Sequence, residues 1–134
     1  MNFESEGLTA EQLARLEAVP SEPGEFGLVR LLGAWKQWVL EVERGENHVP
    51  EELESLYATR DDLDSALVRT SPDDRLLVFP IVDAFDRRFR DATVANAGST
   101  VPANDPWSWW HGRVPIGNAA RLYLYGRLDQ QTPS

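Results

Sequence analysis

LVRLLGAWKQWVLEVER, residues 28–44, is the most secure helical pattern of this chain. Its apolar side chains recur at spacings of three and four, which is the periodicity of one face of an α-helix. They are Leu28, Leu31, Leu32, Trp35, Trp38, Val39 and Val42. Gly45 follows as a helix-terminating residue. We therefore expect a central helix over 28–44, with Trp35 and Trp38 side by side in the core.

The segment before this helix carries the signals of a shorter one. The side chains of Thr9 and Gln12 are spaced to accept hydrogen bonds from each other's backbone N–H groups, which is a capping box. Leu8 and Leu13 flank the cap as a hydrophobic staple. We expect a helix over 10–19, ended by the proline- and glycine-containing sequence that follows it.

A third helical pattern begins at Pro50. This proline suits a first helical position, and the glutamates after it favour the positive end of the helix dipole. The pattern extends over 51–69, either as one helix with a defect or as two short helices. A second capping signal at Thr59 favours a break there.

A fourth helix is predicted to start after Ser71, which is a good N-cap followed by a proline and two aspartates. It should end near Thr93. Pro80 lies inside the pattern, and because an interior proline costs about 3 kcal/mol, we expect the helix to be kinked or restarted there.

The C-terminal third has an irregular composition. Residues 94–106 are rich in small and polar residues and predict a flexible loop. Residues 107–128 should then cross the helices as a strap. Within this strap, RLYLY at 121–125 is too short a pattern to decide between strand and helix.

The length and composition indicate a single globular domain over residues 1–134, since 42% of the residues are hydrophobic and 26% are charged. We expect an all-α domain of about four or five helices with an irregular tryptophan-rich C-terminal segment. The absence of cysteine excludes disulfides, thiol catalysis and cysteine-ligated metals. No apolar run approaches the roughly 20 residues of a membrane span, and no signal-peptide pattern opens the sequence, so we expect a cytoplasmic protein.

The net charge of −9 is concentrated in the first part of the chain. Residues 1–54 hold 12 acidic and 4 basic side chains, whereas residues 55–134 hold 10 and 9. Such a surface repels phosphate backbones and anionic lipid, so neither nucleic acid nor a membrane is an expected partner. It would instead attract a basic protein.

Two pairs of aspartates form the one enzyme-like pattern of the sequence. Asp61 and Asp64, like Asp83 and Asp86, lie one helical turn apart, and carboxylates on facing helices can hold a magnesium ion. The pattern is similar to that of the all-α nucleotide pyrophosphohydrolases, whose Glu-x-x-Glu and Glu-x-x-Asp pairs ligate magnesium beside a nucleotide triphosphate. The resemblance implies a magnesium-dependent nucleotide hydrolase, although both pairs here are all aspartate and no lysine-rich phosphate site follows.

The same aspartates also have structural explanations, which we favour. The first pair would stabilise the N-terminal turn of a helix that begins after Thr59. The second pair would form ion pairs with Arg87 and Arg90, four residues further along. On this interpretation the chain has no metal site and needs no cofactor.

Catalytic motifs are absent from the rest of the sequence. The two histidines, His48 and His111, show no metal-ligand spacing. There is no Gly-x-Ser-x-Gly nucleophile motif and no Gly-x-x-x-x-Gly-Lys phosphate loop. We therefore assign no catalytic residue.

The segment Trp107–His111 holds three of the five tryptophans. In an extended chain Trp107 and Trp109 would share one face and Trp110 the other. The favoured interpretation is that the segment closes the helical core as a strap.

The functional alternative leaves at least one indole exposed as an anchor for a protein partner or a small ligand. The binding residues would then be Trp107, Trp109, Trp110, His111 and Arg113. His111 and Arg113 would form the polar rim, and a cation–π pair between Arg113 and Trp110 suits either interpretation. A small-ligand site would also include Tyr125.

DRRFRDAT at 86–93, followed by a loop and a proline-bounded tryptophan segment, resembles the C-terminal half of a group of small bacterial helical proteins of uncharacterised function. The resemblance implies a helix followed by a tryptophan strap and implies no activity. The sequence thus favours a non-enzymatic protein-interaction module, of inhibitor or immunity type, with the magnesium hydrolase and the ligand-binding module as alternatives. The oligomeric state is left open.

Overall fold

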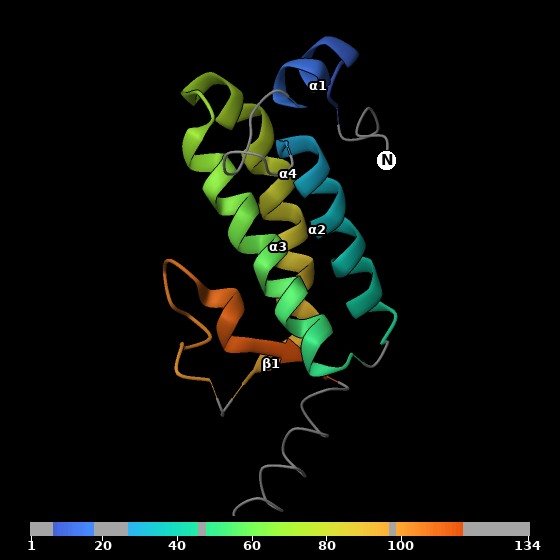
Figure 1. Ribbon diagram of the computed structural model, residues 1–134, viewed down its shortest axis with the longest axis vertical. Helices are drawn as coiled ribbons and strands as arrows, with labels where there is room; N and C mark the ends of the chain where they lie inside the picture. The colour runs from blue at the N-terminus through green and yellow to red at the C-terminus, as the bar shows by residue number, and fades with distance from the viewer. Residues whose placement is uncertain (1–6, 18–26, 46–47, 97–98, 117–134) are drawn as a thin grey trace, which may run out of the picture.

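The computed structural model of the chain describes residues 7–17, 27–45, 48–96 and 99–116. Its described elements, in chain order, are α1 (Ala10–Glu17), α2 (Leu28–Glu43), α3 (Pro50–Arg69), α4 (Pro72–Asp91), β1 (Thr93–Ala95), the 3₁₀-helix η2 (Trp109–Gly112) and β2 (Arg113–Pro115). Figure 1 shows α2, α3 and α4 as a bundle, with α1 at one end and the β1–η2–β2 region toward the other. The predicted all-α class is confirmed, since four helices accompany a single two-stranded sheet in this part of the chain.

The central position of α2 agrees with the sequence pattern. The helix packs against α1, α3 and α4, and Trp35 is completely buried in its apolar stripe. Trp38 is only half-buried and donates its indole N–H to Thr59 Oγ1 at 3.2 Å. Gly45 follows the helix with a φ of +76°, which is a conformation that glycine adopts without strain.

The first helix begins with the predicted capping box. The Thr9 N–H donates to Gln12 Oε1 at 2.9 Å, and the Gln12 N–H donates to Thr9 Oγ1 at 3.1 Å. Leu8 is buried and Leu13 is packed against the same core. The predicted helix end at residue 19 lies outside the described residues.

The predicted break at Thr59 is wrong, because α3 is continuous from Pro50 to Arg69. To act as an N-cap, Thr59 would have to accept a hydrogen bond from a backbone N–H two or three residues further along. Here that hydroxyl donates to the carbonyl of Ser55 at 2.8 Å and accepts from Trp38. The hydroxyl that predicted the cap is therefore hydrogen-bonded to a side chain of another helix and to its own helix backbone.

The fourth helix is capped as predicted, since Ser71 Oγ accepts from the Asp74 N–H at 3.3 Å. It runs on through Pro80 to Asp91 as one element. Pro80 is exposed, so the carbonyl of Leu76, which loses its helical donor, lies where water can reach the helix surface. No helix among the described residues is both long and apolar enough to cross a membrane.

A two-stranded antiparallel sheet joins the end of α4 to the tryptophan segment, and the sequence did not predict it. Val94 pairs with Val114 at its centre, and the Asn96 N–H donates to the Gly112 carbonyl at 2.8 Å. A Cβ at Gly112 would lie 2.5 Å from the carbonyl oxygen of Val101, so this close approach requires glycine. Part of the predicted 94–106 loop is therefore a strand. Residues 121–125 lie outside the described residues.

The bundle is asymmetric. α2 packs closely on both α3 and α4, whereas the backbones of α3 and α4, although consecutive in the chain, make few close approaches to each other. The gap between α3 and α4 is therefore spanned by side chains and by η2, and the candidate site lies along it.

Candidate functional site

Trp107 is exposed on a loop that one carboxylate holds in place. Its exposed fraction is 81%, although indoles usually bury most of their surface. Asp105 Oδ2 accepts from the N–H groups of Ser108 at 2.8 Å and Trp107 at 3.0 Å, and from the Ser108 hydroxyl at 3.1 Å. The backbone bonds from Ser108 and Trp107 hold the pKa of the Asp105 carboxyl below its usual range, because they favour the charged form. The ring thus meets solvent from an ordered backbone.

Trp109 and Trp110 turn inward and fill one half of the gap between α3 and α4. They are 7% and 3% exposed, and their rings meet edge to face with centroids 5.6 Å apart. Trp109 packs on Phe89 of α4, and the Arg90 guanidinium lies 3.9 Å from its ring centre. The predicted division, with Trp107 and Trp109 on one face, is wrong because residues 109–112 form a 3₁₀ turn rather than an extended chain.

Asp61 of α3 fixes this turn. Its Oδ1 accepts from Trp110 Nε1 at 2.8 Å and lies 2.8 Å from His111 Nε2. The His111 ring also packs on Tyr57, with centroids 5.1 Å apart. The Tyr57 hydroxyl donates to the carbonyl of Arg113, and burial raises the Tyr57 pKa to about 12. His111 is thus held by α3, with part of its ring still at the surface.

A buried ion pair lies directly beneath the turn. Arg60 donates from Nε to Asp86 Oδ1 at 3.1 Å and from Nη2 to Oδ2 at 2.9 Å. Trp35 donates its indole N–H to the same carboxylate at 3.0 Å. The guanidinium also stacks on Trp110, 4.3 Å from the ring centre. This network joins α2, α3, α4 and η2, and no motif in the sequence indicated it because its members are far apart along the chain.

Arg113 has a structural role in this arrangement. Its Nε donates to Thr93 Oγ1 at 2.8 Å, and its Nη2 donates to the carbonyls of Thr93 at 2.8 Å and Arg90 at 3.1 Å. The cation that stacks on Trp110 is Arg60 rather than Arg113. Of the predicted binding residues, Trp107 therefore offers the largest free surface.

The structure separates the four predicted aspartates. Asp61 faces η2, while the other three line a pocket between α3 and α4. Asp83 pairs with Arg87 at 3.0 Å as predicted. Asp86 binds Arg60 across the gap instead of its predicted partner on the same helix. Within the described residues, no group of three or more histidine, aspartate or glutamate side chains is placed to hold a metal ion.

That pocket is the open half of the gap and has a volume of about 610 Å³. At one end it borders the Arg60–Asp86 pair. Toward the start of α4 its wall includes Leu76 and Phe79, which are 73% and 47% exposed. We call this pocket the α3–α4 groove. It combines exposed apolar surface with carboxylates.

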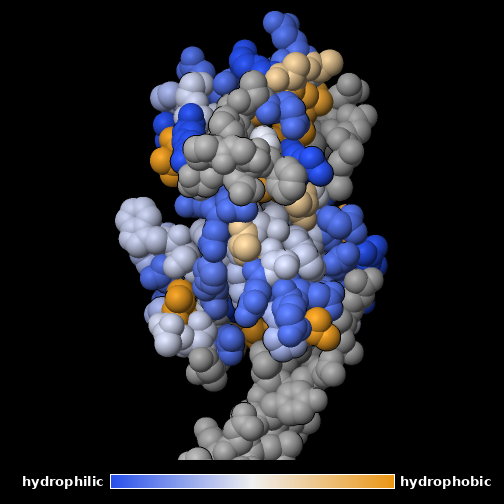
Figure 2. All heavy atoms as spheres, viewed as in Figure 1, coloured by the Kyte–Doolittle hydropathy of each residue, from blue (hydrophilic) through white to orange (hydrophobic). Residues whose placement is uncertain are grey.

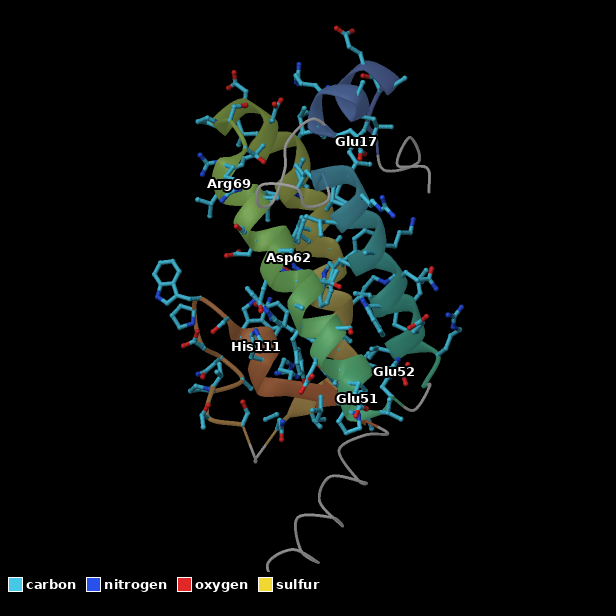
Figure 3. All side chains as sticks on the ribbon, in the orientation of Figure 1. Glu17, Glu51, Glu52, Asp62, Arg69 and His111 are labelled. Carbon is cyan, nitrogen blue, oxygen red and sulfur yellow. The ribbon has the colours of Figure 1, made fainter. Side chains whose placement is uncertain are left out.

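The outward surface of α3 is acidic. This helix carries six acidic and two basic side chains, and one of the two basic ones, Arg60, is buried. Figure 3 shows Glu51, Glu52 and Asp62 along the helix, and in Figure 2 the same face of the molecule is mostly hydrophilic. The candidate site is thus bordered by negative charge.

Asp105 is a residue of the candidate site that the sequence interpretation missed. An Asx-type turn is indicated where an aspartate precedes a proline and can accept hydrogen bonds from the backbone N–H groups two and three residues later. The signal lies in the segment treated as a flexible loop.

No protein-family model, curated protein or solved structure matches the chain.

Proposed function

We propose that this protein is a non-enzymatic protein-interaction module, of inhibitor or immunity type, that covers a basic surface of a partner protein with Trp107 as its anchor. The observation that carries the proposal is the 81% exposure of Trp107 on a loop that Asp105 orders. Tryptophan is enriched among residues that dominate binding energy, because a partner's pocket removes a large apolar ring from water. An ordered backbone reduces the entropy that binding must overcome.

The charge of the surrounding surface supports a basic partner. The acidic face of α3 borders η2, since Asp61 of that helix holds both Trp110 and His111. Carboxylates at the rim of an interface accelerate association with a positive surface and disfavour partners of the same sign.

The magnesium hydrolase has less support. Asp86 already binds a guanidinium through both oxygens, and Asp61 accepts from an indole N–H. A magnesium ion would have to displace these partners. The small-ligand alternative also has less support, because two of the rings predicted to line its site, Trp109 and Trp110, are buried. A third, Tyr125, lies outside the described residues.

The proposal is tested by photo-crosslinking in the native cells, with a benzophenone amino acid at position 107 or at position 68. Val68 is the matched control, since it is apolar and 71% exposed but lies on α3 away from the loop. We expect a partner that crosslinks from position 107 and not from position 68.

The purified partner then allows affinities to be compared. Trp107→Ala should weaken binding at least about tenfold, Val68→Ala should not, and rising salt should weaken all three forms. Equal crosslinking from both positions, or an unchanged affinity of Trp107→Ala, would refute the proposal. Release of phosphate from nucleoside triphosphates with magnesium would favour the enzyme instead.

A further inference from the structure

The gap between α3 and α4 is filled along only part of its length, and we call the two parts its filled half and its open half. In the filled half, Trp109 contacts Phe89 of α4, and Trp110 donates to Asp61 of α3. In the other half the α3–α4 groove is open. Arg60 lies where the two halves meet, since it stacks on Trp110 and also lines the groove.

The open half exposes apolar surface that folding usually buries. Leu76 is 73% exposed and Phe79 is 47% exposed, and both line the groove. Along α4, Pro80 lies between these two residues and the aspartates Asp83 and Asp86. It cannot donate a hydrogen bond to the carbonyl of Leu76, because proline has no backbone N–H. Exposed apolar side chains grouped beside polar ones mark binding surfaces more often than isolated ones do.

The charges in the groove select the kind of occupant. Asp64, Asp83 and Asp86 line it together with a single lining cation, Arg60, so the net charge of the lining is negative. Asp86 is paired with Arg60, and Asp83 is paired with Arg87, whose side chain is not part of the lining. Asp64 and Asp83 have half-exposed side chains, at 49% and 54%. An occupant with lysine or arginine is therefore favoured over a neutral or acidic one.

One hydrogen-bond donor of the buried Arg60 side chain is unused beside the groove. Arg60 Nη1 is buried and has no hydrogen-bond partner within the described part of the chain, and the nearest carboxylate oxygen, Asp64 Oδ1, is 3.7 Å away. A buried donor without an acceptor is unfavourable. A carbonyl oxygen brought by an occupant would satisfy it after a small shift.

The filled half shows what such a gap accepts. There an aromatic ring stacks on Arg60, and its N–H bonds to a carboxylate of α3. We infer that the open half is a second docking site, which takes a partner segment with one aromatic or large aliphatic residue flanked by lysine or arginine. The apolar side chain lies against Leu76 and Phe79, and the cations face Asp64 and Asp83. This inference rests on the proposed protein-binding function and specifies the chemistry of the partner.

The test uses the full chain labelled with ¹⁵N and a synthetic peptide of about ten residues that has a central tryptophan between lysines. We expect its addition to shift the backbone resonances of residues 64–67 and 76–83. The same peptide with glutamate in place of lysine, and the lysine peptide without tryptophan, should each bind at least about tenfold more weakly.

Two exposed residues provide the matched variants. Leu76→Lys adds a cation within the groove, and Val68→Lys adds one at an equally exposed apolar position outside its lining. Because both side chains are exposed, neither change should unfold the protein. Leu76→Lys should abolish the peptide-induced shifts, and Val68→Lys should retain them.

The inference would be overturned by shifts that lie away from the groove, by equal binding of the glutamate peptide, or by retained binding by Leu76→Lys. Groove resonances that move with protein concentration alone would identify a second copy of the chain as the occupant and would also overturn it. The outcome is separable from that of the proposed function, since the peptide test does not involve Trp107. If the peptide fails while Trp107→Ala still weakens the partner, only the groove is refuted.

Discussion

The two halves of the α3–α4 gap have the same helices as walls and share Arg60, yet one is closed and the other is open. In the closed half, Trp109 and Trp110 pack between Phe89 and the guanidinium of Arg60. In the open half, Leu76 and Phe79 lie exposed beside carboxylates. The backbones of α3 and α4 make few close approaches to each other, so a third element can lie between them. The chain supplies this element on one side, and we propose that a partner supplies it on the other.

The largest expected effect comes from breaking the ion pair that separates the halves. Asp86→Ala leaves Arg60 buried without its carboxylate and leaves the Trp35 indole N–H without its acceptor. We expect the free energy of unfolding in urea to fall by about 3–5 kcal/mol. The double variant Arg60→Met with Asp86→Leu should recover most of this loss, since it removes both charges. A loss below about 1 kcal/mol for Asp86→Ala would mean that the pair does not join the helices.

The next effect distinguishes the filled half from the exposed ring. Trp110→Ala creates a cavity beside Arg60 and removes the indole donor of Asp61, and should cost about 3 kcal/mol in thermal or urea unfolding. Trp107→Ala should change stability by no more than about 0.5 kcal/mol, because its ring is mostly in solvent. Equal costs for the two variants would contradict the division of the segment into core and anchor.

The hydroxyl of Tyr57 makes the stability that the closed half contributes depend on pH. Burial raises the Tyr57 pKa from 10.0 to about 12, so the folded state favours the protonated phenol. The resulting stability is complete below pH 10 and declines as the pH rises from 10 toward 12. Urea unfolding across this range should show a smaller alkaline decline in Tyr57→Phe than in the wild type. Parallel curves for the two proteins would show that the phenol is not buried.

The smallest effect concerns the loop under Trp107. The Asp105 pKa lies below its usual range, so its carboxylate stabilises the loop above the ordinary aspartate pKa, and this stability is lost as the pH falls through the lowered value. In Asp105→Ala the N–H groups of Trp107 and Ser108 lose their acceptor. Their amide hydrogen exchange should accelerate, with α3 unchanged. Unchanged exchange would show that Asp105 does not order the loop under Trp107.

Local signals predicted much of the fold. Three features could be recognised from the sequence alone, because each involves residues within a few positions of one another. They are the capping box at Thr9, the N-cap at Ser71 and the apolar stripe of 28–44. Thr59 was misleading because its tertiary surroundings override the local preference, and the helix does not restart at Pro80. The Thr59 hydroxyl accepts a hydrogen bond from the indole N–H of Trp38, and Pro80 is tolerated on the exposed side of α4.

The site was only partly predictable. The sequence named Trp107 as one of five candidates but could not distinguish it from Trp109 and Trp110, because their directions depend on a 3₁₀ turn. The partners of Asp86 and Trp110 lie 26 and 49 residues away along the chain. No spacing rule connects residues so far apart, so the network and the groove beside it became visible only in three dimensions.

The indole N–H resonances of the five tryptophans, recorded with a soluble gadolinium chelate, report whether Trp107 faces solvent while Trp109 and Trp110 fill the gap. This arrangement of the rings predicts strong broadening for Trp107 and sharp resonances for Trp35, Trp109 and Trp110. A protected Trp107, or broadening of Trp109 and Trp110 equal to its own, would contradict it.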